Sequence, residues 1–394
     1  MKILHITPSY IPAYSHGGPV VSVHILNKWL VKLGVDVTVY TTNVDGDKKL
    51  DVPLNQEVNT DEVKIFYFPL SFRAWKYSLQ LHSALKNNMK DFDLIHITSV
   101  FLSASMLGAY YAKKYRKPYI ISPRGNFMKQ TYGSKSLKKI IYTHCIEKYA
   151  LKNAFALHFT SEAEKNDYIH TKLPFRKALI IPNPLNEEMT DREKNNMSFR
   201  DTWKIHKNAE VILSLGRLHW VKGFDTLIPA FADVLKEKPG AVLVIAGPDE
   251  SNYKKEIELL ITCHKVQGHV IFTGIISGEE KASVLREADV FVVPSFSESF
   301  GMSAVEAMQA GIATILTDGV GIAEDAQKAN AAVVIKKDKD EFANAIIRLL
   351  ENETKRKELG KRGAEFVERE YSEASVAKKM TDAYRQIVEN SPRI

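Results

Sequence analysis

The stretch DVFVVPSFSESFGMSAVEAMQAG, residues 289–311, contains a strand pattern, a loop and a helix pattern in that order. Residues 290–293 are wholly apolar, which is typical of a strand that is buried on both faces of a parallel sheet. The amphipathic run after the loop ends at Gly311, where a helix can stop because glycine tolerates the left-handed conformation. Two carboxylates, Glu298 and Glu306, flank the start of this helix. The stretch therefore predicts one α/β unit with acidic groups beside its loop.

The same pattern recurs along the whole chain. Short apolar, β-branched runs alternate with longer amphipathic stretches, which favours parallel sheets covered by helices on both faces. Predicted strands occupy residues 2–7, 36–42, 63–69, 93–98, 118–122, 156–160 and 178–182, and then 211–215, 241–247, 269–274, 289–294, 313–318 and 331–336. We therefore predict an α/β fold of two Rossmann-like, doubly wound parallel-sheet domains that face each other across a cleft, in which ligands bind beyond the carboxyl ends of the strands.

The domain boundary is set by a polar stretch that lacks a strand. A chain of 394 residues exceeds the roughly 250–300 residues at which single cores stop growing. The strand pattern lapses after the sequence IIPNPLN and resumes at VILSL. We place the first domain at residues 1–185 and the second at 186–375.

Composition limits the class of protein. Hydrophobic residues make up 45% of the chain and charged residues 26%, as in ordinary soluble globular proteins. The first residues run straight into a strand, and no apolar run approaches the ~18 residues that span a bilayer, so we expect neither a signal peptide nor a membrane helix. Cys145 and Cys263 lie far apart, which fits a reducing cytoplasm. Neither has the partners of a metal site, and we expect no metal and no cofactor.

Positive charge is concentrated in residues 113–152, which hold eleven Lys or Arg residues and one acid, Glu147. A solvated helical face explains such a run, and so does a surface that meets anionic lipid or a phosphorylated substrate. We expect no nucleic-acid partner because no binding motif accompanies the charge.

Two loops that follow strands carry residues suited to a phosphate-bearing ligand. Gly17 and Gly18 precede a helix, so backbone amides there can approach a phosphate closely. In GRLHWVKGFDTL, Arg217 follows a strand and Lys222 opens the next helix. Two cations beside a helix start suit a diphosphate on which negative charge grows during bond cleavage.

The loop quoted at the start is the third candidate. Glu298 stands before its helix and has no capping pattern. Glu306 has two interpretations, because Ser303-Ala-Val-Glu306 also fits a capping box in which the carboxylate bonds back to the helix start. The amides predicted to lie unpaired at the helix start are those of Ser299, Phe300, Gly301 and Met302.

In combination these residues resemble a known family. Gly-Arg-Leu at 216–218, Lys-Gly at 222–223 and the Glu-x7-Glu spacing of Glu298 and Glu306 are similar to the nucleotide-sugar site of retaining GT-B glycosyltransferases, in particular glycosyltransferase family 4 (glycosyl transferases group 1). The resemblance covers most of the chain, including the early Gly-Gly loop, the Pro-Asn-Pro linker and the C-terminal helix. It implies that this helix, about 376–394, packs back on the first domain.

The resemblance also implies roles. Arg217 and Lys222 would bind the donor diphosphate and neutralise it as the leaving group. Glu298 would hold hydroxyls of the donor sugar, and Glu306 those of the ribose. The amides of residues 299–302 would meet the sugar and the diphosphate.

On the first domain the resemblance is less complete. The Gly17-Gly18 loop would close on the donor phosphate. Arg124 stands where many family members have a histidine beside the donor sugar, and it could bind an acceptor phosphate or stabilise charge during catalysis. A second His-x-His pattern is reduced to His96, a candidate acceptor contact for which a core histidine is the alternative.

Family members use no metal and retain the anomeric configuration, since the acceptor hydroxyl attacks the face that the diphosphate leaves and a phosphate oxygen takes its proton. Metal-using glycosyltransferases of the other main fold need an Asp-x-Asp motif. Asp45-Gly46-Asp47 matches the letters, but it lies in a polar stretch that we interpret as a turn.

We therefore expect a retaining, metal-independent hexosyltransferase that moves a sugar from a nucleotide-diphosphate sugar to a lipid-linked or saccharide acceptor. Its expected setting is bacterial surface polysaccharide biosynthesis in the cytoplasm, at the inner face of the membrane, with residues 113–152 in contact with anionic lipid. A soluble small-molecule acceptor and a non-catalytic sugar-nucleotide-binding subunit are the alternatives. Specificity should lie in loops 247–253, 273–278 and 317–325.

Overall fold

A computed structural model describes residues 1–394 except 15–17, 73–75, 130–142, 144–146, 186–197 and 392–394. It divides into two compact units. Unit 1 comprises Met1–Pro184 with Glu373–Ile394, and unit 2 comprises Leu185–Ser372. The first division falls one residue before the position predicted from the sequence, and the chain returns to unit 1 three residues earlier than predicted.

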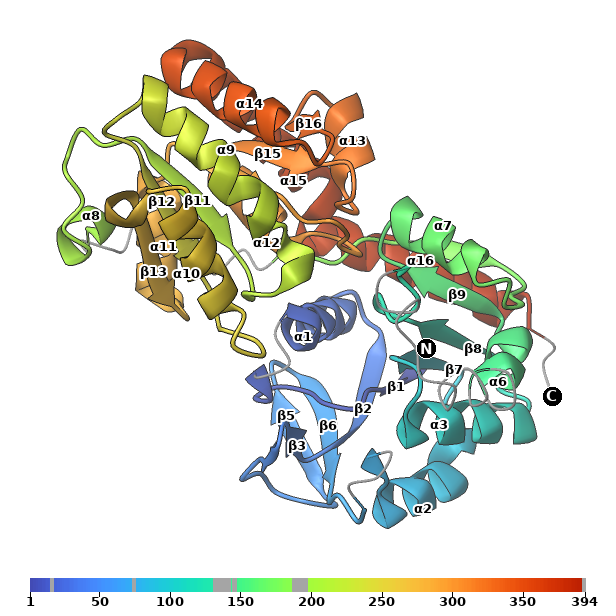
Figure 1. The fold of residues 1–394 in the computed structure, drawn as a ribbon. Helices are drawn as coiled ribbons and strands as arrows, with labels where there is room; N and C mark the ends of the chain where they lie inside the picture. The colour runs from blue at the N-terminus through green and yellow to red at the C-terminus, as the bar shows by residue number, and fades with distance from the viewer. Residues whose placement is uncertain (15–17, 73–75, 130–142, 144–146, 186–197, 392–394) are drawn as a thin grey trace. The chain divides into compact units, whose positions relative to one another are not determined.

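Unit 1 is built on an eight-stranded sheet in the order β10-β9-β8-β7-β1-β2-β6-β5 (Figure 1). Its strands are β1 (Lys2–Ile6), β2 (Asp36–Thr42), β5 (Glu57–Thr60), β6 (Val63–Phe68), β7 (Leu94–Thr98), β8 (Tyr119–Ser122), β9 (Ala156–Phe159) and β10 (Ala178–Ile180). Its helices are α1 (Gly18–Lys32), α2 (Leu79–Asn88), η3 (Met89–Asp91), α3 (Ser103–Lys114), α6 (Lys148–Asn153), α7 (Glu162–His170) and α16 (Glu373–Glu389). Neighbouring strands run parallel except β5, which pairs antiparallel with β6.

The pattern of β1 explains why both faces of this sheet are covered. Ile3 points into a core shared with α1 and α16, whereas Leu4 and Ile6 point into a core shared with α2 and α3. All three side chains are 0% exposed. Burying an Ile or Leu side chain contributes about 1.5–3 kcal/mol, so a strand with apolar side chains on both of its faces is stabilised by helices on both sides.

The sequence did not predict β5 or the small hairpin of β3 (Val44–Asp45) and β4 (Lys48–Lys49). β4 and β5 are mainly polar and partly exposed, and β3 is only two residues long, so none of them carries the apolar run by which the others were predicted. The Asp45-Gly46-Asp47 stretch forms the turn of this hairpin, where Gly46 has a φ of +59°.

Unit 2 has a six-stranded parallel sheet in the order β13-β12-β11-β14-β15-β16 (Figure 1). Its strands are β11 (Val211–Leu215), β12 (Val242–Ala246), β13 (Val270–Gly274), β14 (Val290–Val293), β15 (Ala313–Thr317) and β16 (Val333–Ile335). Its helices are α8 (Phe199–Thr202), η6 (Trp220–Lys222), α9 (Phe224–Glu237), α10 (Lys254–Cys263), η7 (Gln267–His269), α11 (Gly278–Glu287), α12 (Met302–Gln309), α13 (Ala323–Lys328), α14 (Lys339–Glu351) and α15 (Glu353–Tyr371).

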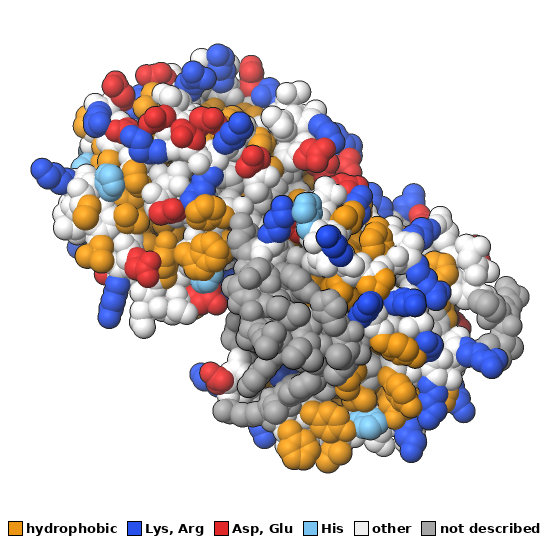
Figure 2. Space-filling model, turned by 45° about the vertical axis from the view of Figure 1, so that its right-hand side comes forward, with side chains coloured by type: hydrophobic (Ala, Val, Ile, Leu, Met, Phe, Trp, Pro, Cys, Tyr) orange, Lys and Arg blue, Asp and Glu red, His pale blue; other side chains and the backbone are white. Residues whose placement is uncertain are grey.

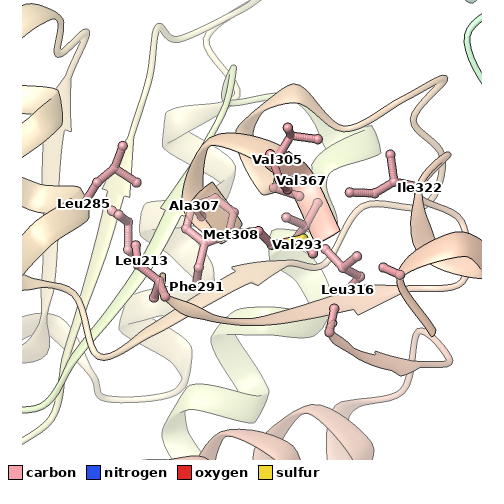
Figure 3. Close-up of a cluster of buried hydrophobic side chains, with 14 of the residues drawn as sticks. Leu213, Leu285, Phe291, Val293, Val305, Ala307, Met308, Leu316, Ile322 and Val367 are labelled. Atoms are coloured by element: carbon pink, nitrogen blue, oxygen red, sulfur yellow. The ribbon is translucent and has the colours of Figure 1, made fainter. Parts of the chain in front are cut away.

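Helix α12 is anchored on one face of this sheet by the cluster drawn in Figure 3. Val305, Ala307 and Met308 of α12 lie in the same buried core as Phe291 of β14 and Leu316 of β15. On the other face α9, α10 and α14 cover the sheet. The start of α12 is therefore fixed at the carboxyl end of β14, where α/β sheets bind ligands.

Within the described ranges, no helix has both the length and the apolar character that crossing a membrane requires.

Candidate active site

The loops that follow β11, β12, β14 and β15 are joined to one another at the carboxyl edge of the unit 2 sheet. The Phe296 amide donates to the Val221 carbonyl at 2.8 Å, and the Glu298 amide donates to the Gly319 carbonyl at 3.0 Å. Leu218 pairs with the loop after β12 through an isolated parallel bridge. Because backbone hydrogen bonds hold these loops to one another, the backbone from which the side chains project has a fixed position.

Two glycines allow the loops to approach so closely. Gly223, at the start of α9, has a φ of +73°, and a Cβ there would lie 1.9 Å from the Pro294 carbonyl oxygen. Gly301, at the start of α12, has a φ of +105°, and a Cβ there would lie 2.6 Å from a methyl group of Val320. Any other residue would be strained at either position.

Lys222 and Glu298 form an ion pair between the loops after β11 and β14, with Nζ and Oε1 2.6 Å apart. The side chains are only 19% and 13% exposed. Ser295 Oγ also donates to Glu298 Oε1 at 2.6 Å. Both donors lie on Oε1, and among the described residues Oε2 has no hydrogen-bond partner, so this oxygen remains for a ligand.

The charge state of Glu298 follows from these contacts. Burial alone would raise its pKa, but the Lys222 ammonium, the Ser295 hydroxyl and the Arg217 guanidinium together hold the pKa below its ordinary value. Glu298 is therefore ionised at neutral pH and can accept hydrogen bonds from hydroxyl groups.

Arg217 stands close to this pair but is less constrained. Its Nη1 lies 2.5 Å from Oε2 of Glu250, in the loop after β12, and its side chain is 62% exposed. Ion pairs at such exposure contribute at most about 1 kcal/mol. An anion can therefore draw Arg217 away from Glu250 at little cost.

The start of α12 offers backbone donors beside the ion pair. Gly301 is the N-cap residue and supplies no side-chain cap. The amides of Phe300, Gly301 and Met302 have no acceptor among the described residues. The Phe300 side chain itself lies in the core against Tyr371, so only its amide faces the edge.

Glu306 forms an ion pair with Lys281 of α11, with Oε1 and Nζ 2.8 Å apart. The two side chains are 15% and 18% exposed. The capping-box alternative is wrong, because Gly301 and not Ser303 is the N-cap of α12. Glu306 is thus a half-buried carboxylate with a cationic partner, one helical turn beyond the unpaired amides.

A pocket of about 480 Å³ lies beyond the carboxyl ends of β11, β12 and β13. This volume is within the range of small-ligand sites. The pocket is lined by Leu218, Gly247, Pro248, Asp249, Lys254, Phe272, Thr273, Gly274 and Ile275. Most of these residues belong to the loops 247–253 and 273–278, which the sequence predicts to determine substrate specificity.

In unit 1, Gly17 lies outside the described residues, and Gly18 is the exposed first residue of α1. Arg124 follows β8 with a left-handed φ of +53° and donates from Nη1 to the Asn183 side chain. Its Nε is buried without a partner. Burial lowers the pKa of Arg124 to about 10, against the opposing effect of Glu164, so the guanidinium stays charged at neutral pH.

His96 lies at the centre of a buried polar chain and is 0% exposed. Its Nδ1 is 2.5 Å from the Tyr384 hydroxyl and its Nε2 is 2.6 Å from Ser122 Oγ. His5 stacks on it at 4.3 Å between ring centroids. Burial, with the neighbouring His5 and His158, holds the pKa of His96 well below its ordinary value. This is the arrangement of a neutral core histidine, the alternative that the sequence left open.

Two family models and several known proteins match this chain. Residues 16–189 match the family described as Glycosyltransferase Family 4, and residues 196–366 match Glycosyl transferases group 1. An uncharacterized glycosyltransferase of Methanocaldococcus jannaschii is 30% identical over 298 residues, 75% of this chain and 76% of its own. The chain belongs to glycosyltransferase family 4. A second uncharacterized glycosyltransferase of that organism is 26% identical to this family 4 glycosyltransferase over 99% of both chains.

Further relatives of this glycosyltransferase have named activities or solved structures. The alpha-monoglucosyldiacylglycerol synthase of Streptococcus pneumoniae is 26% identical, over 80% of this chain and 70% of its own. Sucrose-phosphate synthase from Thermosynechococcus elongatus has a TM-score of 0.78 at 22% identity, covering 99% of this chain and 100% of its own. Anabaena HepE, solved with UDP and glucose, has a TM-score of 0.78 at 18% identity, covering 98% and 100%. These likenesses show that the glycosyltransferase has the GT-B fold.

The sequence predicts Arg217, Lys222, Glu298 and Glu306 as site residues, but it does not predict three further side chains that contact them. Ser295, Glu250 and Lys281 of this glycosyltransferase contact the site residues directly. Ser295 lies in the quoted stretch and could have been noticed as a hydroxyl three residues before Glu298. Glu250 and Lys281 carry no sequence signal, because only the folded sheet brings their elements to the site.

Proposed function

We propose that this glycosyltransferase moves a sugar from a nucleotide-diphosphate sugar to a lipid-linked or saccharide acceptor, with retention of anomeric configuration and without a metal. The observation that carries the proposal is the Lys222–Glu298 pair beside the unpaired amides of α12. A cation, a carboxylate with a free oxygen and a helix start within one loop cluster suit a diphosphate joined to a sugar.

Each group has a task in this reaction. Lys222 and Arg217 neutralise the charge that grows on the diphosphate as it leaves, assisted by the amides of Gly301 and Met302. Glu298 accepts hydrogen bonds from hydroxyl groups of the donor sugar through Oε2, and Glu306 accepts hydrogen bonds from the ribose hydroxyls. The protein thereby stabilises the departing charge with its own cations and backbone dipoles, so no metal is needed for that purpose.

Retention follows from the side on which the acceptor enters. The acceptor hydroxyl attacks the face that the diphosphate leaves, and a diphosphate oxygen takes its proton. Arg124, charged and with a buried Nε that lacks a partner, stabilises charge on the acceptor side or binds an acceptor phosphate. An arginine is always protonated here and does not act as a general base.

The donor is supported by a structural neighbour and the acceptor by a relative. HepE was solved with UDP and glucose, and the 480 Å³ pocket has room for a nucleotide base. The name of the Streptococcus relative describes a lipid acceptor. We place this reaction in bacterial surface polysaccharide assembly, on the cytoplasmic side of the membrane.

The test begins with thermal-shift measurements on UDP-, GDP- and ADP-sugars. Binding at 100 times Kd adds about 2.7 kcal/mol to stability, which raises the midpoint clearly. The stabilising donor is then incubated with diacylglycerol or with monosaccharides, and release of the nucleoside diphosphate is followed. An NMR coupling constant of the product reports the anomeric configuration, and turnover after EDTA treatment tests the absence of a metal. Binding without transfer to any acceptor would favour the non-catalytic alternative.

We further propose that residues 113–152 contact an anionic membrane. In the described part of this segment Tyr149 is 51% exposed, and Lys113 Nζ lies 4.3 Å from the centre of its ring. Nearby on α3, Tyr110 is also 51% exposed. Figure 2 shows many Lys and Arg side chains and few Asp or Glu side chains over its lower right part, with hydrophobic side chains among them. Exposed Tyr and Lys together suit a lipid headgroup region. Flotation with vesicles should show a preference for phosphatidylglycerol over phosphatidylcholine, and equal binding to both would contradict the contact.

A further inference from the structure

Four cationic side chains line a pocket of about 250 Å³ in unit 1. They are Lys113, Arg116, Lys117 and Arg176. The pocket lies at the amino ends of β8 and β9, because Lys117 and Pro118 directly precede β8 and Phe155, also in its lining, directly precedes β9. Arg124 follows the carboxyl end of β8, so the pocket occupies the opposite edge of the sheet from the loop assigned to the reaction.

Contacts to the protein hold the pocket in shape. Lys113 Nζ donates to Asn153 Oδ1 at 2.9 Å. Arg176 Nε donates to the Lys152 carbonyl at 3.1 Å, which leaves its two terminal nitrogens for a ligand. The Lys117 amide donates a hydrogen bond to the Ala112 carbonyl, in the last turn of α3, at 2.8 Å. Lys113 and Arg176 are thus oriented by contacts to the protein, and together with Arg116 they stay exposed to solvent, where a ligand can reach them.

The charge of the pocket is not compensated. No carboxylate lines it, and none of the four cations forms an ion pair with any residue that the structure describes. Like charges held together raise the free energy of the empty pocket, and an anion relieves this repulsion. Arginine nitrogens in a fork match the oxygens of a phosphate in particular.

The size of the pocket limits the anion. Its volume of about 250 Å³ lies below the roughly 300–1,000 Å³ of sites for drug-sized ligands, so a whole nucleotide sugar would not be enclosed in it. A single phosphate group with a short substituent does.

We propose that this pocket binds a phosphate group, as a lipid headgroup or as a small phosphate ester. The site is separate from the donor site in unit 2, and the proposal does not depend on glycosyl transfer. Occupation of the pocket by a lipid phosphate would hold unit 1 on a membrane through specific contacts, in addition to diffuse attraction between charges.

The test compares two triple variants of the full chain with the same change of charge. The pocket variant is Arg116→Gln/Lys117→Gln/Arg176→Gln. The control variant, Lys48→Gln/Lys49→Gln/Lys378→Gln, removes three exposed lysines of unit 1 that do not line the pocket. Circular dichroism and thermal midpoints check that both are folded.

Two probes distinguish the source of the phosphate. Calorimetry with glycerol 3-phosphate measures the soluble ester, and flotation with vesicles of phosphatidylcholine containing phosphatidylglycerol measures the lipid. No donor sugar is present, so the outcome is independent of catalysis. We expect the pocket variant to bind at least one probe roughly tenfold more weakly than wild type, whereas the control should stay within about twofold.

A loss with glycerol 3-phosphate identifies a soluble ester and supports the pocket. A loss confined to vesicles supports the pocket as a site for a lipid phosphate when Arg116→Lys/Arg176→Lys, which keeps the charge, also binds vesicles more weakly than wild type; if this variant binds vesicles as wild type does, diffuse attraction explains the loss and the pocket is overturned. Equal binding by the pocket variant and the control with both probes would overturn it. If the pocket variant is unfolded, Arg116→Lys/Arg176→Lys replaces it. These lysines keep the charge but lose the fork, so weaker binding than wild type supports the site and unchanged binding overturns it.

Discussion

Replacing Lys222 by methionine separates the stabilising role of the Lys222–Glu298 pair from its role in catalysis. At 2.6 Å and an effective dielectric constant of 20, the attraction between the two charges is about 6 kcal/mol. Most of this offsets the cost of removing both charges from water. Loss of one partner from a buried pair typically costs about 3–5 kcal/mol. Since Ser295 still donates to Glu298 and the site is slightly exposed, we expect the free energy of unfolding to fall by about 2–3 kcal/mol.

The double variant Lys222→Met/Glu298→Gln should recover most of this stability, because no buried charge is then left without a partner. Transfer should not recover. The cation that neutralises the leaving group is absent from both variants, and loss of one such group costs about 10²–10³ in kcat. Urea unfolding gives the stability, and release of the nucleoside diphosphate gives the rate.

A matched control is the pair of Lys236 and Asp233, which has the same 2.6 Å separation but a lysine that is 73% exposed. Lys236→Met should change the free energy of unfolding by less than about 1 kcal/mol and leave transfer unchanged. Equal stability losses for Lys222→Met and Lys236→Met would show that the buried pair does not form. Transfer at the wild-type rate by the double variant would show that the assigned site is wrong.

Three further predictions concern other parts of the fold. Burial raises the pKa of Glu147 from 4.5 to about 7 in the folded protein. Ionisation of this side chain therefore lowers the free energy of unfolding by roughly 3 kcal/mol at pH 8 and by a smaller amount between pH 4.5 and 7. Below pH 4.5 this cost disappears. Glu147→Gln should therefore be more stable than wild type at pH 8 and equal to it at pH 4.5 in urea unfolding; a difference that does not vary with pH would contradict this. Gly223→Ala should lower the free energy of unfolding by at least about 3 kcal/mol, because its Cβ would meet the Pro294 carbonyl oxygen. The control Gly240→Ala, whose Cβ would have no atom within 4 Å, should lower it by less than about 1 kcal/mol. Thermal midpoints of the two variants test this difference. Tyr384→Phe leaves His96 without one of its two hydrogen-bond partners and should lower the free energy of unfolding by about 1–3 kcal/mol, with no change in the KM for acceptor. A raised KM would indicate that His96 contacts the acceptor.

Most strands of both sheets could be predicted from the sequence because each carries a short run of mainly apolar or β-branched residues. Every predicted strand is present, with ends displaced by at most two residues. The exceptions are polar strands such as β5, whose residues alternate between exposed and half-buried positions at the edge of the sheet. Such a strand is stabilised by pairing with its neighbour, β6, and not by a run of apolar side chains of its own.

The site was predicted only where its residues share a motif. Glu298 and Glu306 lie on one strand–loop–helix unit, so their spacing fixes their positions relative to the helix start. The pairing of Glu306 with Lys281 depends on how α11 packs beside α12, and no local pattern encodes it. The stacking of His5 on His96 could not be predicted for the same reason, since the two rings meet only through the register of β1 and β7.

The helix α16 has a consequence for synthesis of the protein. Val376, Met380 and Tyr384 fill the core on one face of the unit 1 sheet, and Tyr384 reaches His96 across 288 positions of the chain. Proteins emerge from the ribosome from the N-terminus onward, and their domains generally fold as units. Unit 2 is one continuous segment and can fold as soon as Ser372 has emerged. Although unit 1 is started first, the part of its sheet that α16 covers beside α1 stays exposed until α16 follows, so the unit that is begun first is completed last.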